Sequence, residues 1–273
     1  RSRGLGDVYK RQVLGEEIMK KSNKIKSIFL ILAIITTAVA YGGCANSTVS
    51  NSSDNIEVNS VDSSSEDSPE TKLTESKDEE FSSNIRDDGN MDIIAYDGEA
   101  NIINVPDSVD GKPVIEIRGY FLRGSDNVLE INVPDTITEI SEQAFALCAN
   151  LEKLTMGNDV QKIGQSLCLG DSKLKQVVLS QSLSEISHYA FQNCTSLEEI
   201  TIPDSVTTIG FAFSGCTALK EIHMTDSVTF IGVPEDNEEC NVFEDSDNLT
   251  IYAPAGSYAE QYAKNNNITF VAE

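Results

Sequence analysis

Apolar residues recur along the second half of the chain at a fixed spacing. Residues 197–210, LEEITIPDSVTTIG, carry leucine, isoleucine and valine at intervals that four other segments repeat. The equivalent inward positions lie 23, 23, 23 and 22 residues apart, at Ile131, Leu154, Val177, Ile200 and Ile222. A fixed period of this length is typical of repeat proteins, whose units stack along one axis. The pattern therefore predicts a solenoid.

Each repeat contains the pattern of a short strand followed by a turn. Ile200 and Ile202 alternate with Glu199 and Thr201, so two side chains are expected inside and two outside. The Pro-Asp-Ser segment 203–205 then turns the chain. We expect the strands of successive coils to pair in parallel, about 4.8 Å apart, with short helical or 3-10 segments on the back. Because one coil cannot bury its apolar stripe alone, stability must come from stacking.

Weaker copies of the repeat flank the regular coils, and a cap is expected at the C-terminal end. An imperfect coil precedes them at 103–109 and another follows at 249–251, which gives about seven coils. Ser257 and Glu260 match a capping box, so we expect a short helix there. That helix and a final strand would form a cap over about residues 253–273.

The full repeat, Ala-Phe-x-x-Cys-x-x-Leu-x-x-Ile-x-Ile-Pro-Asp-Ser-Val-x-x-Ile-Gly, resembles the BspA-like subclass of leucine-rich repeats. The Ala-Phe pair stands at 144–145, 190–191 and 212–213, but the coil between the first two places Cys168 where phenylalanine belongs. We expect a smaller, looser back at that coil. The resemblance implies a right-handed leucine-rich-repeat solenoid with a parallel sheet on its concave side. It also implies a surface protein, since many members are surface proteins and some adhere to host matrix proteins.

The N-terminal part of the chain has the features of an export signal. Residues 1–18 precede the first methionine, and we interpret them as a leader foreign to the native protein. Residues 19–43 join several lysines to an apolar stretch too short to span a membrane, which predicts a signal peptide. The small residues before Cys44 resemble the lipobox of bacterial lipoproteins, although Tyr41 stands where an aliphatic residue is usual. We expect Cys44 to be lipidated and to anchor the protein at the bacterial cell surface. A secreted protein without an anchor is the alternative.

Composition separates a linker from the folded domain. Residues 44–92 are rich in Ser, Asn, Asp and Glu and poor in large apolar side chains. Such a segment cannot bury enough surface to offset its ordering entropy, so we expect a disordered acidic linker. Residues 93–273 are expected to form the leucine-rich-repeat domain. The formal net charge of −24 disfavours nucleic acid as a partner, since it would repel the phosphates.

Candidate residues for chemistry are few. Cys148, Cys194 and Cys216 recur at one position of the repeat, which indicates small buried side chains. A disulfide between Cys194 and Cys216 remains open. The aspartates after the proline turns supply about one carboxylate per coil, too few for calcium. His188 and His223 have no patterned nucleophile beside them. The sequence therefore predicts no metal, no cofactor and no enzyme.

The outward strand positions form the surface on which we expect a partner to dock. These positions make two columns that continue from coil to coil and contain no tyrosine or tryptophan. Because sugars stack on aromatic rings, the columns favour binding of an unknown host or bacterial protein, with carbohydrate or cell wall as the alternative. The candidate residues are Glu130, Asn132, Lys153, Thr155, Gln176, Val178, Glu199, Thr201, Glu221 and His223.

Overall fold

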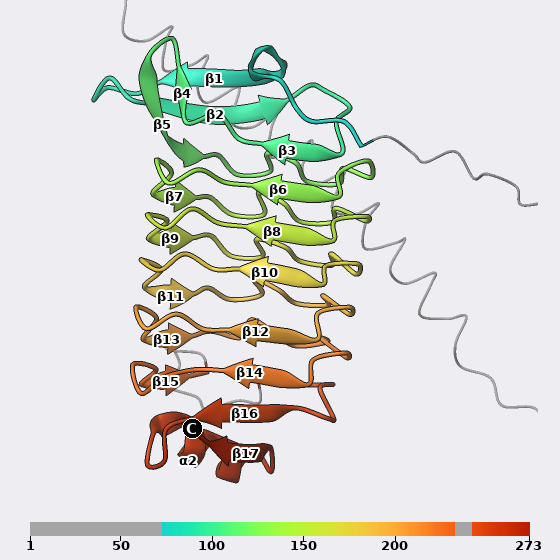
Figure 1. The fold of residues 1–273 in the computed structure, drawn as a ribbon, viewed down its shortest axis with the longest axis vertical. Coiled ribbons are helices and arrows are strands. Elements are labelled where there is room, and N and C mark those ends of the chain that lie inside the picture. The colour runs from blue at the N-terminus through green and yellow to red at the C-terminus, as the bar shows by residue number, and fades with distance from the viewer. Residues whose placement is uncertain (1–72, 233–241) are drawn as a thin grey trace, which may run out of the picture. The chain divides into compact units, whose positions relative to one another are not determined.

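The computed structural model describes residues 73–232 and 242–273 of the chain. The predicted leader, signal peptide and lipidated Cys44 lie outside the described residues, as does the predicted linker before residue 73. Figure 1 shows the described part as a stack of coils that begins at β1 and ends at β17. Two columns of strands run along this stack, and we call them the first and second ladders.

The first ladder contains one short strand per coil. Its strands pair in parallel and in register on either side of one interruption, so that Ile131 lies opposite Leu154 and Ile200 lies opposite Ile222. The predicted inward positions are therefore confirmed. The strands are β3 (Ile102–Asn104), β6 (Glu130–Asn132), β8 (Lys153–Thr155), β10 (Gln176–Val178), β12 (Glu199–Thr201), β14 (Glu221–His223), β16 (Thr250–Ala253) and β17 (Thr269–Ala272).

The second ladder was not predicted from the sequence. It forms where each coil returns after the turn that follows its first-ladder strand. Its inward isoleucines pair with one another on either side of one interruption, as Ile186 does with Ile209. Two hydrogen-bonded residues per strand are too few to leave a periodic signature. The strands are β5 (Lys112–Ile117), β7 (Glu139–Ile140), β9 (Lys162–Ile163), β11 (Glu185–Ile186), β13 (Thr208–Ile209) and β15 (Phe230–Ile231).

The back of each coil consists of turns where short helical segments were expected. Two positions per coil recur in the left-handed region of backbone space, and a left-handed residue interrupts a right-handed helix. Because Gly170 and Gly215 have no Cβ, their φ angles of 78° and 75° cost little. The non-glycine residues at these two positions are Tyr120, Gln143, Leu147, Ser166, Tyr189, Asn193 and Asp245.

The core is one continuous stripe of apolar side chains along the stack. Phenylalanine rings form a column at the back, with ring centroids 5.6 Å apart between Phe191 and Phe213 and 5.7 Å apart between Phe213 and Phe243. Cys168 takes the phenylalanine position in its coil and is fully buried. It separates Phe145 from the stacked rings that follow, so the column of phenylalanine rings is interrupted at this coil.

The N-terminal boundary of the folded domain differs from the prediction. Residues 73–92 were assigned to the disordered linker, but they contain the 3-10 helix η2 (Asp78–Glu80), strand β1 (Phe81–Ile85) and the start of β2 (Met91–Tyr96). Strand β1 pairs antiparallel with β2, and β2 pairs with β5 of the first coils. The prediction failed because this segment is not periodic, yet it covers the open end of the stack.

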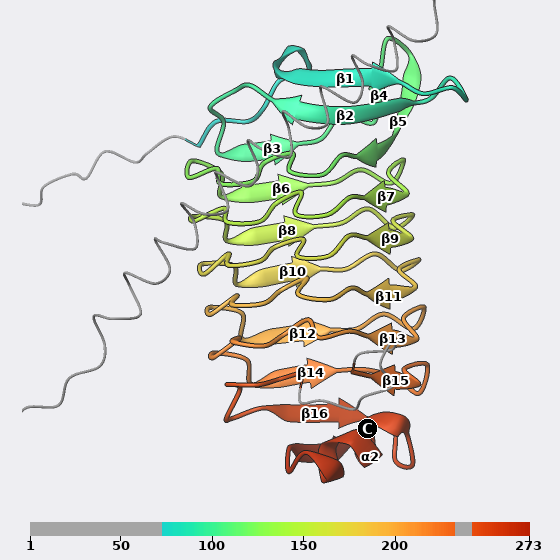
Figure 2. The same ribbon diagram turned by 180° about the vertical axis from the view of Figure 1, so that it is seen from behind.

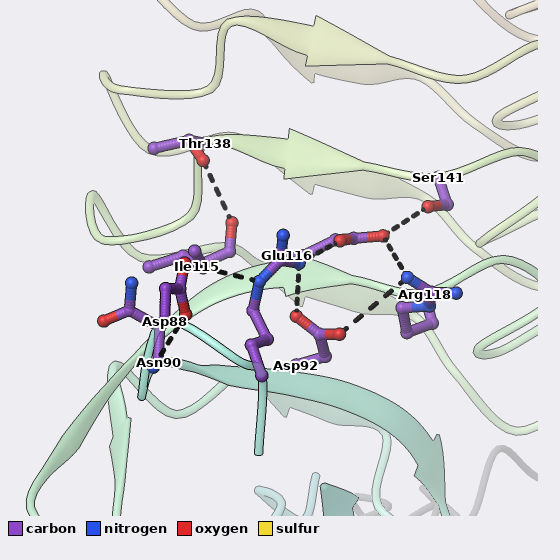
Figure 3. A network of polar contacts seen from close by, with 9 residues as sticks. Asp88, Asn90, Asp92, Ile115, Glu116, Arg118, Thr138 and Ser141 are labelled. Carbon is purple, nitrogen blue, oxygen red and sulfur yellow. Dashed lines mark hydrogen bonds and ion pairs between the residues drawn. The ribbon is translucent and has the colours of Figure 1, made fainter. Parts of the chain in front are cut away.

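The N-terminal cap is held by a network of charged side chains (Figure 3). The Arg86 Nη1 atom donates to Asp92 Oδ1 at 2.8 Å and to a carboxylate oxygen of Glu116. Arg118 and Ser141 donate to the other oxygen of Glu116, at 3.1 and 2.8 Å. Asp92 and Glu116 are both buried, and a buried carboxylate is tolerated when it is paired and hydrogen-bonded. The network therefore fastens β1 and β2 to the first coils.

The C-terminal cap contains the predicted helix, α2 (Tyr258–Asn265). The Ser257 side chain accepts from the Glu260 amide at 3.3 Å, as in a capping box. The Glu260 carboxylate accepts from the Gly256 amide at 2.6 Å, one residue before the predicted donor. Tyr262 is buried under the last coils, and its hydroxyl accepts from the Val242 amide at 2.9 Å. Figure 2 shows α2 closing this end of the stack, and Figure 1 shows β17 at the same end.

Candidate functional site: the outward face of the first ladder

The predicted candidate residues all lie on outward positions of the first ladder. Each is partly or fully exposed, whereas the residue between the two outward positions of a strand is largely buried. The strand register aligns the candidates into the two predicted columns. The register partners are Glu130 with Lys153, Lys153 with Gln176, Asn132 with Thr155, Thr155 with Val178, Glu199 with Glu221, and Thr201 with His223.

The N-terminal half of this face is occupied by contacts within the chain. Lys153 Nζ donates to Glu130 Oε1 at 2.9 Å, and this bond lowers the pKa of Glu130. Asn132 donates to the Asn104 side chain, also at 2.9 Å. These polar groups already have partners, so this half offers fewer groups to a ligand.

The first ladder is interrupted between β10 and β12. Strands β3 to β10 form one four-stranded sheet and β12 to β17 form another. On either side of the interruption, the Met156 amide donates to Val178 O at 2.9 Å and the Ile202 amide donates to His223 O at 2.8 Å. Among the described residues, no backbone hydrogen bond joins β10 to β12. The facing edges of these two strands therefore do not pair with each other.

A hollow of about 730 Å³ lies over this interruption. Its lining comes from β10, β12 and β14 and from Glu273 near the last strand. Val178 gives the hollow an apolar element, because 42% of this residue is exposed. Glu199, Asp204 and Glu273 supply three carboxylates to the lining. Lys175 also lines the hollow, and its Nζ atom forms an ion pair with the Oε2 atom of Glu152 at 2.9 Å.

An aromatic pair lies beside the hollow. Strand β16 continues the ladder and places Tyr252 opposite His223, with ring centroids 4.5 Å apart and planes 12° from parallel. The imidazole Nδ1 of His223 also lies 3.3 Å from a carboxylate oxygen of Glu273. The predicted columns contain no tyrosine because they end at His223, but the ladder continues by one more strand and adds Tyr252. The imperfect coil at 249–251 was the signal that could have revealed Tyr252.

The cysteines and His188 serve the interior of the stack. The thiols of Cys194 and Cys216 are buried, and each donates to a backbone carbonyl, at 3.2 and 3.1 Å. Both are free cysteines, so no disulfide joins them. His188 Nδ1 accepts from the Phe211 amide at 3.1 Å, which makes this histidine a structural residue of the coil corner.

The part of the chain that the structure describes contains neither a cluster of metal ligands nor a helix that could span a membrane. No group of three or more His, Cys, Asp or Glu residues in this part is arranged to hold a metal ion. No helix in it is long and apolar enough to cross a membrane.

Stacked coils of 22 or 23 residues, each with a short parallel strand, define a leucine-rich-repeat solenoid. The family model described as the BspA type leucine rich repeat region matches residues 115–250 in six copies. The repeat domain of this chain belongs to that family. No curated protein matches the chain.

Solved structures similar to this chain are bacterial leucine-rich-repeat proteins. A leucine rich cell surface protein from Faecalibacterium prausnitzii is 26% identical with a TM-score of 0.52, and the match covers 65% of this chain and 54% of that one. A leucine rich repeat protein from T. pallidum is also 26% identical, with a TM-score of 0.44 and coverage of 66% and 71%. This chain therefore spans about half the length of the Faecalibacterium protein.

Proposed function

We propose that this protein is a non-catalytic bacterial cell-surface protein that binds another protein through the hollow between β10 and β12. The observation that carries the proposal is the interruption of the first ladder, which leaves two unpaired strand edges beside an exposed hollow. Extended concave or open faces are the surfaces that solenoid proteins use for binding. The location at the cell surface is supported by the description of the Faecalibacterium protein.

The chemistry of the hollow suits an extended polypeptide segment with basic side chains. Such a segment would lie across the outward face of the hollow, because Cα atoms of β10 and β12 approach within 8 Å of each other and leave no room for an added strand between them. The carboxylates of Glu199, Asp204 and Glu273 favour lysine or arginine on that segment. The net charge of −24 would also speed encounter with a cationic partner.

A pair of charge reversals tests this proposal. Glu199→Lys changes an exposed residue of the hollow, and Glu185→Lys makes the same change on an exposed residue of the second ladder. The full chain is immobilised and exposed to bacterial and host surface proteins, and the captured proteins are identified. We expect Glu199→Lys to weaken capture of the partner about tenfold, with Glu185→Lys close to the unchanged protein. Equal effects of the two variants would place binding elsewhere.

Carbohydrate binding is the second candidate, and the ring pair of His223 and Tyr252 is the observation that favours it. Sugars pack on the faces of aromatic rings, but here each ring already covers one face of the other. A glycan array separates the two candidates. Sugar binding that disappears in Tyr252→Ala, together with no captured protein, would replace the first proposal.

We also propose that the signal peptide at 19–43 directs export and that a lipid on Cys44 then attaches the protein to the membrane. A multiply acylated cysteine holds a membrane firmly, because each buried methylene contributes about 0.8 kcal/mol. The test is fractionation of cells that express Cys44→Ala. The anchor is refuted if this variant still sediments with membranes.

A further inference from the structure

Asp171 is a buried carboxyl at a position where the other coils have a hydrogen-bond donor. It lies 23 residues after Cys148 and 23 before Cys194, and none of its surface is exposed. At this position the side chain normally donates to a carbonyl of the preceding coil. Cys148 donates to Leu122 O, Cys194 to Cys168 O, Cys216 to Phe191 O and Ser246 to Cys216 O, at 3.2, 3.2, 3.1 and 2.9 Å.

In the coil before Asp171, the amide of Cys148 has a different acceptor from the amides at the same position of other coils. In two later coils the amides of Cys194 and Cys216 donate to the carbonyls of Phe191 and Phe213, at 3.2 and 3.1 Å. The Cys148 amide instead donates to Asp171 Oδ1 at 2.8 Å.

Because the Cys148 amide bonds to Asp171 Oδ1, two hydrogen-bond acceptors are left without a donor in the described part of the chain, the Phe145 carbonyl and Asp171 Oδ2. The carbonyl of Phe145 accepts neither the amide of its own coil nor a thiol from the next, and it accepts no other hydrogen bond from the described residues. Asp171 Oδ2 is buried without a partner. A carboxylic acid both accepts and donates, so one proton on Oδ2 allows Asp171 to satisfy the donor requirement of this position.

The surroundings of Asp171 also favour the neutral acid. The titratable groups that face it are the thiols of Cys148, Cys168 and Cys194, and no cation is among them. Burial raises the pKa of each of these thiols, so they remain uncharged. Burial also raises the pKa of Asp171, to about 8, although hydrogen bonds from the Cys148 amide and the Cys168 thiol act in the opposite direction. A buried carboxylate without a cation is costly.

We propose that Asp171 carries a proton in the folded protein and donates a hydrogen bond to the Phe145 carbonyl of the preceding coil, so that the middle of the stack loosens as the pH rises. The folded state favours the neutral form of the Asp171 carboxyl, whereas in the unfolded chain this carboxyl has the ordinary pKa of 3.8. The stabilising effect is therefore complete at acidic pH and is lost progressively as the pH rises towards 8. The same coil contains β10, so the loosening would reach the hollow.

Asp171→Asn tests the proposal in the full chain. Asparagine has the same shape, stays neutral and supplies both an acceptor for the Cys148 amide and a donor for the Phe145 carbonyl. Unfolding by urea is measured from pH 5 to pH 9 for the unchanged protein and the variant. We expect their unfolding constants to diverge by about tenfold per pH unit up to pH 8 and to stay in constant ratio above it. A constant ratio over the whole range would overturn the proposal.

Asp171→Cys is the second variant, because it introduces the residue that three other coils have at this position. It is expected to remove the same pH dependence, and a pH dependence that persists in both variants would assign the effect to another group. The carbon chemical shift of the Asp171 carboxyl in the unchanged protein is a direct readout that needs no variant. A midpoint near pH 8 is expected, whereas a midpoint near the ordinary value of 3.8 would also overturn the proposal.

Discussion

Phe213 illustrates how single residues stabilise the stack. Its ring is fully buried and lies between those of Phe191 and Phe243, at nearly parallel angles of 12° and 15°. Identical side chains at equivalent positions stack because successive coils superimpose along one axis. Cys168 is the exception in this column, and the next donor position in the same coil is occupied by Asp171. Both unusual residues of the interior therefore lie in the coil that precedes the interruption of the first ladder.

Replacing Phe213 by alanine is expected to destabilise the domain by about 3–5 kcal/mol, because it removes a buried ring and leaves a cavity. The free energy of unfolding, obtained from urea titration at one pH, measures the loss. Val178→Ala is the matched control, because 42% of Val178 is exposed and its loss should cost less than about 0.5 kcal/mol. Similar losses in both variants would show that the phenylalanine column does not carry the stability assigned to it.

At the scale of one coil, a missing residue explains the role of His188. The coil between Ile200 and Ile222 is one residue shorter than the others. In the preceding coil His188 and Tyr189 stand at the corner, and Tyr189 is left-handed with φ of 59°. The shorter coil has only Phe211 between Gly210 and the Ala-Phe pair that recurs in this chain. The Phe211 amide then bonds to the His188 imidazole.

His188→Ala is expected to destabilise the domain by about 1–3 kcal/mol, because the Phe211 amide loses its acceptor in a partly buried corner. Hydrogen exchange of the Phe211 amide is the specific measurement, and its protection should fall more than that of amides in distant coils. His188→Gln retains an acceptor oxygen and is expected to recover part of the protection. If the exchange rate of the Phe211 amide is unchanged in His188→Ala, the imidazole does not have this structural role.

At the scale of the whole domain, the caps decide whether the stack is complete. Strands β1 and β2 cover its first coils, and Phe81 adds ring contacts to Tyr96 and Phe121 at 5.0 and 6.2 Å. Arg86 joins the same cap to Glu116 through the charged network. Terminal coils of a solenoid need such a cover, because an uncovered coil exposes both its apolar core and its strand edges.

A chain that begins at residue 93 is therefore expected to be less stable than one that begins at residue 73. The shorter chain lacks β1, Arg86 and Asp92, and it exposes the buried first coils. Circular dichroism during thermal unfolding and size-exclusion chromatography compare the two chains. We expect the shorter chain to unfold at lower temperature and to aggregate. If both chains are monomeric and have equal midpoints of thermal unfolding, residues 73–92 do not stabilise the stack and belong to the linker.

The sequence by itself determined the period, the inward positions and most of the outward columns. Its alternation at Ile200 and Ile202 fixes which side chains enter the core, since a strand side chain and its neighbour point to opposite faces. Register between coils follows from the same repeat, because a shift by one residue would expose the apolar column. All ten candidate residues of this face could therefore be placed without a structure, because their positions recur from coil to coil: Glu130, Asn132, Lys153, Thr155, Gln176, Val178, Glu199, Thr201, Glu221 and His223.

Only the tertiary structure decided the features that depend on contacts between coils. The interruption between β10 and β12 leaves no mark in the repeat, because both strands keep the regular pattern. Tyr252 joins the column after an insertion that breaks the period, and β1 belongs to a cap that has no period. Asp171 resembles an ordinary polar substitution until the structure shows it buried at a donor position. Periodicity reports what the coils share, whereas the proposed hollow and the proposed proton both arise where one coil departs from its neighbours.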